Sequence, residues 1–233
     1  EQIQAIMYLH HGFILLLFFV TSPFLYSMEM NQPRDFYEWQ KNCLRKTVLY
    51  KATKTLEPAV SQEQLLQDIT SFTDAHKQQI LAQKELWVKT SKNPEGFPPE
   101  SFFSSESYQP YVAKKRVKPG TRIAIHGDLH GDVESFNDFL QHLTSENITD
   151  EKNPFKISDP NALILLLGDY TDRGVFGAEV ISAVAHLKEK NPKQIYAVRG
   201  NHEDAFLNDF AGLCTELKEK YKDDATVFNM IEK

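Results

Sequence analysis

The chain has 233 residues, of which 41% are hydrophobic and 25% are charged, an ordinary composition for a globular protein with one large core or two smaller ones. A formal net charge of -6 argues against nucleic-acid binding as its main task. The two cysteines, Cys43 and Cys214, lie far apart in the sequence, so neither a disulfide framework nor a thiolate zinc site is expected.

The first 27 residues contain a short apolar run. Residues 13–20 are apolar throughout and residues 23–25 extend the run, which is too short and interrupted for a stable membrane span. It resembles the core of a secretory signal peptide, with a cleavage point after Ser27. No lysine or arginine precedes it, so a short membrane anchor and upstream sequence translated from an uncertain start remain as alternatives. We expect residues 1–27 to lie outside the fold and favour export, with a cytoplasmic location as the alternative.

Two amphipathic helices are predicted in residues 28–91. Apolar side chains at helical spacing begin at Phe36 for the first helix and at Leu65 for the second. Ser61, followed three residues later by Gln64, has the pattern of a capping box at the start of the second helix. Packing against a core explains both apolar stripes, and docking of a partner or substrate is the alternative.

Residues 92–119 are rich in proline, serine and glycine, which predicts a linker across the surface. A short basic run within it consists of Lys114, Lys115, Arg116 and Lys118. A solvated face explains this run, although it could also help to recruit an anionic substrate.

Strands and helices are predicted to alternate in the remaining region, residues 120–233. Three β-rich runs occupy residues 121–126, 162–167 and 194–198, and stretches with helical periodicity lie between them. This βαβαβ order predicts an α/β fold with a parallel sheet and right-handed crossovers. The middle run is apolar throughout, which predicts a strand buried on both faces.

A short motif directly follows each predicted strand. The motifs are GDLHG at residues 127–131, GDYTDRG at residues 168–174 and GNHE at residues 200–203. Because open α/β sheets bind ligands beyond the carboxyl ends of their strands, we expect the three motifs to meet at one edge of the sheet. Their oxygen and imidazole donors predict a two-metal site that cleaves phosphate esters.

Four side chains in the motifs are candidate metal ligands. Asp128 and His130 are two residues apart, so in an extended chain they project from the same side and can share one ion. Asp169 can bridge that ion to a second ion, to which Asn201 can supply a carbonyl oxygen. Paired ions of this kind clamp a phosphoryl group and lower the pKa of a bound water molecule.

Three further side chains suit the reaction itself. Arg173 offers a planar guanidinium that matches phosphate oxygens, with an ion pair to a neighbouring carboxylate as the alternative. His202 can protonate the leaving oxygen, and Asp172 can fix its orientation; a metal-ligand or supporting role is the alternative for His202. Glu203 and Asp204 are explained by the start of a helix, where acidic residues are favourable.

The three motifs resemble those of the phosphoprotein phosphatase branch of the calcineurin-like metallophosphoesterases, over about residues 122–204. The resemblance implies a four-layer or related α/β core and two metal ions, which could be manganese, iron or zinc. It implies that the metal ligands are Asp128, His130, Asp169 and Asn201. It also implies that His202 is the general acid, that Asp172 is its partner and that Arg173 binds phosphate.

The resemblance further implies hydrolysis of phosphate monoesters on phosphorylated protein serine or threonine by a metal-bound hydroxide. Hydrolysis of dinucleoside polyphosphates or of phosphotyrosine is an alternative on the same core. A non-catalytic metal-binding or interaction module is the alternative from another class of protein.

The family completes its second metal site with two later histidines and its phosphate pocket with another arginine. This sequence has no histidine after His202 and no arginine after Arg199. We therefore expect residues 120–233 to be the N-terminal half of a catalytic core, in a fragment of a longer chain. Completion of the site by a partner chain and an incomplete metal-binding relative are the alternatives.

Overall fold

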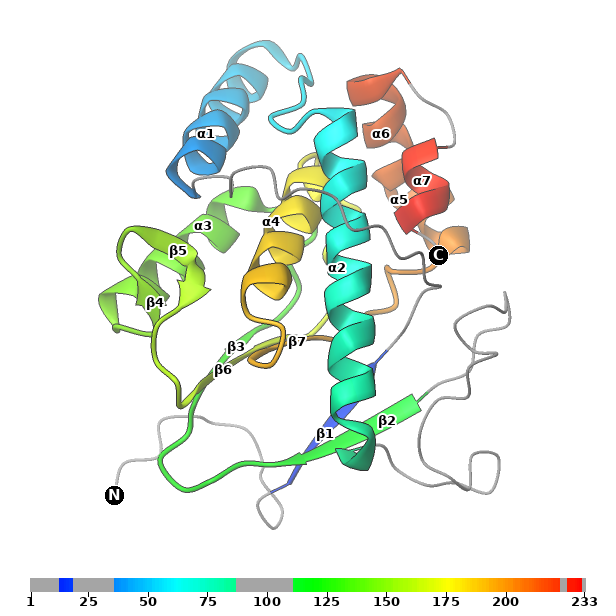
Figure 1. Cartoon of the computed structure of the whole chain (residues 1–233). Helices are drawn as coiled ribbons and strands as arrows, with labels where there is room; N and C mark the ends of the chain where they lie inside the picture. The colour runs from blue at the N-terminus through cyan, green and yellow to red at the C-terminus, as the bar shows by residue number, and fades with distance from the viewer. Residues whose placement is uncertain (1–12, 19–35, 87–110, 223–225, 232–233) are drawn as a thin grey trace.

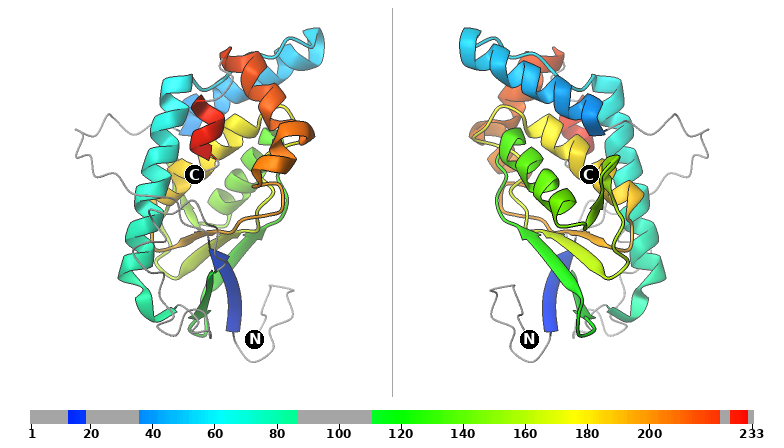
Figure 2. Two further views of the ribbon diagram at one scale, coloured as in Figure 1. Left: turned by 90° about the vertical axis from the view of Figure 1, so that its right-hand side faces the viewer. Right: turned by 90° about the vertical axis from the view of Figure 1, so that its left-hand side faces the viewer.

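A computed structural model of the chain describes residues 13–18, 36–86, 111–222 and 226–231. A small parallel sheet lies at the centre, with helices packed over it (Figure 1). Figure 2 shows α3 (Val133–Ser145) and α4 (Gly177–Lys190) over one face of this sheet. The predicted α/β class is therefore confirmed.

The sheet consists of β3 (Arg122–His126), β6 (Ala162–Leu166) and β7 (Ile195–Ala197), in the order β3-β6-β7. Both strand pairs are parallel. Helix α3 lies between β3 and β6 in the sequence, and α4 lies between β6 and β7. The predicted βαβαβ order is therefore confirmed, with strands up to two residues shorter than the apolar runs.

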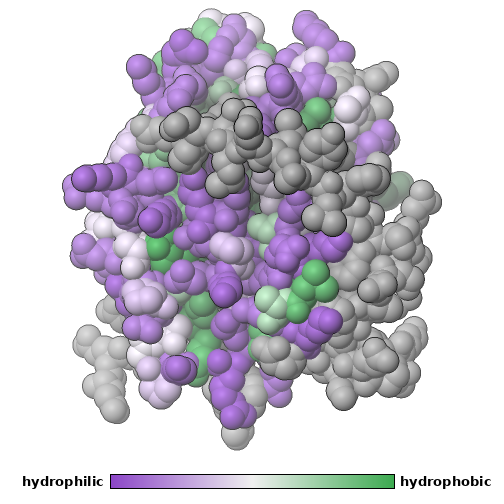
Figure 3. Space-filling view, in the orientation of Figure 1, coloured by the Kyte–Doolittle hydropathy of each residue, from purple (hydrophilic) through white to green (hydrophobic). Residues whose placement is uncertain are grey.

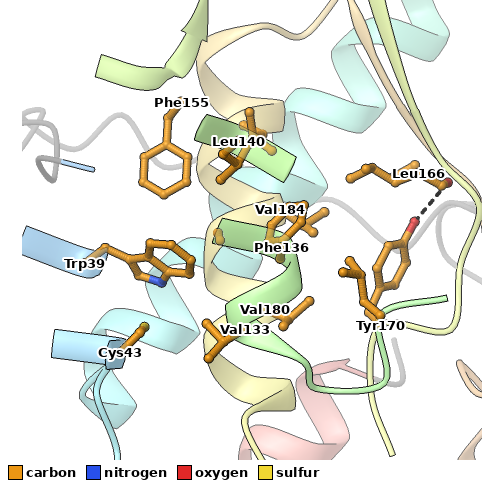
Figure 4. Close-up of a cluster of buried hydrophobic side chains, with 14 of the residues drawn as sticks. Trp39, Cys43, Val133, Phe136, Leu140, Phe155, Leu166, Tyr170, Val180 and Val184 are labelled. Atoms are coloured by element: carbon orange, nitrogen blue, oxygen red, sulfur yellow. Dashed lines mark hydrogen bonds between the residues drawn. The ribbon is translucent and has the colours of Figure 1, made fainter. Parts of the chain in front are cut away.

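The central strand β6 is buried on both faces, as its unbroken apolar sequence predicted. Ile164 and Leu166 belong to the main core, which also contains side chains of α3 and α4 (Figure 4). Leu163 and Leu165 belong to a second core on the other face, together with Tyr196. Alternate side chains of one strand thus hold two layers together.

The two predicted N-terminal helices are present as α1 (Phe36–Thr53) and α2 (Gln62–Ala82), followed by a short 3-10 helix, η1 (Lys84–Leu86). The hydroxyl of Ser61 accepts a hydrogen bond from the Gln64 amide at 3.2 Å, which caps α2. Trp39 of α1 packs edge-to-face on Phe155, with ring centroids 5.5 Å apart. Leu65, Ile69 and Ile80 of α2 are also buried, so packing accounts for most of both apolar faces, although Val48 of α1 is 68% exposed.

An antiparallel hairpin follows α3 and was not predicted. It consists of β4 (Thr149–Asp150) and β5 (Asn153–Ile157), and Phe155 carries its contact with α1. The C-terminal part contains α5 (Ala205–Ala211), α6 (Leu213–Tyr221) and α7 (Thr226–Ile231), which lie near the upper half of α2 in Figure 1.

Part of the predicted linker is a strand. β2 (Tyr111–Arg116) pairs antiparallel with β1 (Phe13–Phe18), and this pairing was not predicted. Lys115 bonds to the Tyr196 hydroxyl and lies 4.8 Å from the centre of that ring, so this member of the basic run is not simply solvated. The predicted cleavage point after Ser27 and residues 92–110 of the predicted linker lie outside the described residues.

The molecular surface over α2 and α4 is mainly hydrophilic, with small scattered hydrophobic areas (Figure 3). Among the helices that the structure describes, none is both long enough and apolar enough to cross a membrane.

Candidate metal and phosphate site

The motifs that follow β6 and β7 lie in contact through their backbones at Gly168 and Gly200. A Cβ atom on Gly168 would clash with the backbone nitrogen of Gly200, and one on Gly200 would clash with the carboxylate of Asp169. Gly168 also has a φ of +95°, in the region that favours glycine. These two glycines therefore allow the second and third motifs to meet, as their positions after adjacent strands predicted.

Three side chains, one from each motif, form a group that could hold a metal ion. One ligand atom from each of His130, Asp169 and His202 lies within 4.8 Å of the others. Asp128, also in the first motif, places Oδ2 3.7 Å from Nε2 of His130, and its side chain is 64% exposed. Asn201 is exposed in the loop between Gly200 and His202. The structure thus gathers His130 and Asp169 from the predicted ligand set, and adds His202.

The hydrogen bonds of the two histidines define which ring nitrogen can bind a metal. Nδ1 of His130 lies 3.0 Å from the Thr171 carbonyl oxygen, which can only accept, so we assign the proton to Nδ1. Nδ1 of His202 likewise lies 2.9 Å from Oδ2 of Asp172. Both rings therefore present an Nε2 lone pair, which is the form that binds a metal ion.

Both Nε2 atoms face the same guanidinium. Nη1 of Arg173 lies 2.7 Å from Nε2 of His130, and Nη2 lies 3.0 Å from Nε2 of His202. Within the described part of the chain, Arg173 thus contacts two imidazoles and not the neighbouring carboxylate that the alternative interpretation required. A cation already lies where the two lone pairs converge.

The Asp172 carboxylate is buried and receives hydrogen bonds from three segments. Oδ1 accepts from the Leu213 amide at 2.8 Å, and Oδ2 accepts from His202 and, at 2.7 Å, from the Asn208 side chain. Leu213 and Asn208 were not singled out in the sequence, because neither lies in a motif. The structure therefore places Asp172 against His202, and both of its carboxylate oxygens accept hydrogen bonds.

The prediction that Glu203 serves only to stabilise the start of a helix is wrong. Its carboxylate accepts hydrogen bonds from the amides of Asp169 and Tyr170, each at 2.8 Å, and of Gly200 at 2.7 Å. Helix α5 is instead capped by Asp204, which accepts from the Phe206 amide at 3.1 Å. Glu203 thus joins the two loops that carry the candidate ligands. Burial raises the pKa of its carboxyl group, and the three amides act in the opposite direction.

The donor set fits a divalent metal ion. Carboxylate oxygens and neutral imidazole nitrogens suit manganese, iron and zinc alike. The Nδ1 protons of both histidines are bound by acceptors, the arrangement that directs Nε2 of a metal-ligating histidine towards its ion. The geometry therefore supports metal binding without selecting one metal.

Known proteins are similar to the C-terminal half of the chain, which contains the three motifs. Residues 121–232 match the calcineurin-like phosphoesterase family. The serine/threonine-protein phosphatase PP2A-like PPG1 of Candida albicans is 34% identical over 109 residues, which are 47% of this chain and 23% of that protein. Serine/threonine-protein phosphatase 5 of Arabidopsis thaliana is 32% identical over 111 residues, which are 48% of this chain and 18% of that protein.

A solved structure is also similar to part of the chain. It is the protein serine/threonine phosphatase of Saccharomyces cerevisiae that has similarity to human phosphatase PP5. Its sequence is 31% identical, the TM-score is 0.39, and the match covers 49% of this chain and 32% of that chain. The chain thus covers less than a quarter of the length of the Candida and Arabidopsis relatives. Residues 121–232 form a calcineurin-like phosphoesterase domain related to the PP5 and PP2A-like serine/threonine phosphatases.

Proposed function

We propose that this protein is a metal-dependent phosphomonoester hydrolase whose substrates are proteins phosphorylated on serine or threonine. The observation that carries the proposal is the convergence of His130, Asp169 and His202 on one point, with the Arg173 guanidinium beside them. The names of the related phosphatases support the choice of substrate.

Two metal ions, of manganese, iron or zinc, are proposed for the site. Asp128 and His130 would hold the first ion, Asp169 would bridge the two, and Asn201 would bind the second. When bound, such ions neutralise charge on the phosphoryl group and lower the pKa of a water molecule.

The protein's own side chains would bind the phosphate and supply a proton. Arg173 would bind phosphate oxygens through its planar guanidinium. Water adds to phosphorus as the ester P–O bond breaks. His202, protonated on both ring nitrogens, would give the Nε2 proton to the departing oxygen, which leaves as an alcohol, and the proton that water loses would restore the protonated ring. Asp172, in contact with Nδ1 of His202 at 2.9 Å, would stabilise the protonated ring.

Metal binding and turnover test the proposal together, on the full-length gene product beside the 233-residue chain. We expect the full-length product to bind manganese in a calorimetric titration and to hydrolyse p-nitrophenyl phosphate and a phosphoserine peptide. The 233 residues alone have no histidine after His202 and no arginine after Arg199, so they should turn over substrate much more slowly. A dinucleoside polyphosphate assayed in parallel should be a poor substrate. Absence of metal binding and turnover in the full-length product would contradict the proposal, and preference for the nucleotide would contradict the substrate class.

Variants separate the roles of individual residues. Asp169→Asn should abolish metal-dependent turnover, and wild-type rates would contradict the bridging role. His202→Asn should keep the metal and slow turnover, whereas loss of metal would make His202 a ligand. Asp209→Asn, at an exposed position on α5, is the matched control and should change neither property.

A further inference from the structure

We propose that Asn208 is a positioning residue that holds Asp172 and His202 in the arrangement needed for proton donation. Asn208 lies on α5, outside the three motifs, and its side chain is completely buried. The inference rests on the proposed function, because the proton donor it concerns is His202.

Both members of the pair receive a hydrogen bond from the same amide group. Nδ2 of Asn208 lies 2.7 Å from Oδ2 of Asp172 and 2.7 Å from the backbone oxygen of His202. It also lies 3.3 Å from Oγ1 of Thr171. The two protons of one NH₂ group thus bridge the residues whose side chains are 2.9 Å apart.

The chemistry of the neighbours fixes the orientation of the amide. The Asp172 carboxylate and the His202 carbonyl can only accept hydrogen bonds, so a flipped amide would place Oδ1 against two acceptors. In the orientation assigned here Oδ1 is buried and finds no hydrogen-bond partner among the described residues. A buried amide oxygen without a hydrogen-bond partner lowers the stability of the fold. The NH₂ group of the same side chain donates only to Thr171, Asp172 and His202, which belong to the candidate site.

Backbone groups near Asn208 also bind the loop that carries Asp172. The amide of Leu213 donates to Oδ1 of Asp172 at 2.8 Å, and the Arg173 amide donates to the Ala211 carbonyl at 3.0 Å. These bonds fix the position of the loop, whereas Asn208 acts on the carboxylate oxygen that also contacts His202. Without Asn208 that oxygen would lose one of its two donors and could rotate away from Nδ1.

Nuclear magnetic resonance tests the arrangement without requiring turnover. In the wild-type chain the Nδ1 proton of His202 should give a slowly exchanging resonance, assigned by its absence in His202→Asn. In Asn208→Ala we expect this proton to exchange at least about tenfold faster or its resonance to disappear. An unchanged shift and exchange rate would overturn the proposal. Asp209→Ala, at the exposed neighbouring position, is the control and should retain the resonance.

A second variant covers the case in which Asn208→Ala does not fold. Asn208→Ser keeps one donor but is too short to reach both acceptors, so it should also speed exchange of the His202 proton. If Asn208→Ser behaves as the wild type, the proposal is overturned.

Leaving-group dependence tests the consequence for catalysis. p-Nitrophenolate leaves readily without a proton, whereas phenolate benefits from protonation. Asn208→Ala should therefore reduce kcat for phenyl phosphate about tenfold more than kcat for p-nitrophenyl phosphate. Equal loss on both substrates would indicate a merely structural role. These rates are measured in the full-length gene product. If its wild-type form hydrolyses neither ester, the proposed function fails, and the exchange measurement alone decides whether Asn208 holds Asp172 and His202 together.

Discussion

Nδ1 of His202 lies 2.9 Å from Oδ2 of Asp172, although the two residues are 30 positions apart and belong to different loops. Both side chains are buried, so the contact depends on how closely the loops after β6 and β7 approach. At Gly168 and Gly200 the two loops approach so closely that a Cβ atom on either residue would clash with the other loop. The arrangement of the site can therefore be disturbed by a single added methyl group.

Gly168→Ala should destabilise the protein by about 1–3 kcal/mol, through backbone strain and the clash with Gly200. Urea unfolding of the variant measures the change in free energy. Gly127→Ala is the matched control, because Gly127 holds the equivalent place in the first motif and a Cβ there would meet nothing within 4 Å. This control should change stability by less than about 0.5 kcal/mol. Equal losses in the two variants would contradict the role given to the loop contact.

Arg173→Met should bind manganese at least as tightly as the wild type. The guanidinium contacts Nε2 of His130 at 2.7 Å and Nε2 of His202 at 3.0 Å, so a metal ion must compete with it for the same lone pairs. The inhibition constant of inorganic phosphate should rise about tenfold in this variant, because the proposed contact of Arg173 with two phosphate oxygens would be removed. Calorimetric titration and an inhibition assay measure the two effects, with Arg122→Met at the start of β3 as the control. Loss of metal binding in Arg173→Met would make Arg173 a structural support of the ligands.

The parts of the fold that the sequence predicted are those with a local pattern. The apolar run of β6 and the helical stripes of α1 and α2 reflect burial along one element, and the motifs follow the strands directly. β2 was missed because its charged residues, including Lys115, are typical of a solvated segment, whereas the contact with Tyr196 depends on tertiary structure. The β4–β5 hairpin was missed because β4 has only two residues and β5 begins with asparagine and proline, which are typical of turns.

The same distinction applies to the candidate site. Asp172 and His202 could be named from their motifs, because their side-chain chemistry suggests their roles. The roles of Glu203, in the third motif, and of Asn208, outside the motifs, could not be predicted. Glu203 accepts from amides more than 30 residues away, and Asn208 donates to Asp172, 36 residues away, and to the His202 carbonyl, six residues away. An acid before a helix and an asparagine within one have common local explanations, and only the fold reveals the backbone amides and the carboxylate that they contact.

Glu203→Gln should weaken both stability and metal binding. Glutamine replaces one carboxylate oxygen with an NH₂ group, which would face the amide protons of Asp169 and Gly200 or that of Tyr170. A buried donor facing another donor costs about 1–3 kcal/mol. Urea unfolding and manganese titration measure the two effects. Glu219→Gln, at an exposed position on α6, should leave both unchanged, and the same result for Glu203→Gln would refute its role in joining the ligand loops.

A buried ion cluster holds the start of α4, which follows the second motif, and Lys220→Met tests it. Lys220 contacts Glu179 and Glu216, and all three side chains are at most 1% exposed. Glu216 also accepts the first two amides of α4, those of Gly177 and Ala178, each at 2.9 Å. Burial opposes the charge on Lys220, but the two carboxylates outweigh it and raise the pKa of the ammonium group.

Lys220→Met should cost about 3–5 kcal/mol of unfolding free energy at pH 7, because it leaves two buried carboxylates without a counter-ion. The raised pKa means that the stabilisation by Lys220 is fully present below its ordinary pKa of 10.5 and is lost only as pH rises through the higher folded value. Burial raises the pKa of Glu179, so its charge is least tolerated when Lys220 is absent. The variant should therefore regain stability as pH falls from 7 to about 5 and Glu179 takes up a proton. Lys218→Met, at an exposed position on the same helix, is the control for urea unfolding at both pH values. A similar small loss in both variants, or no recovery at the lower pH, would show that the cluster does not depend on the charge of Lys220.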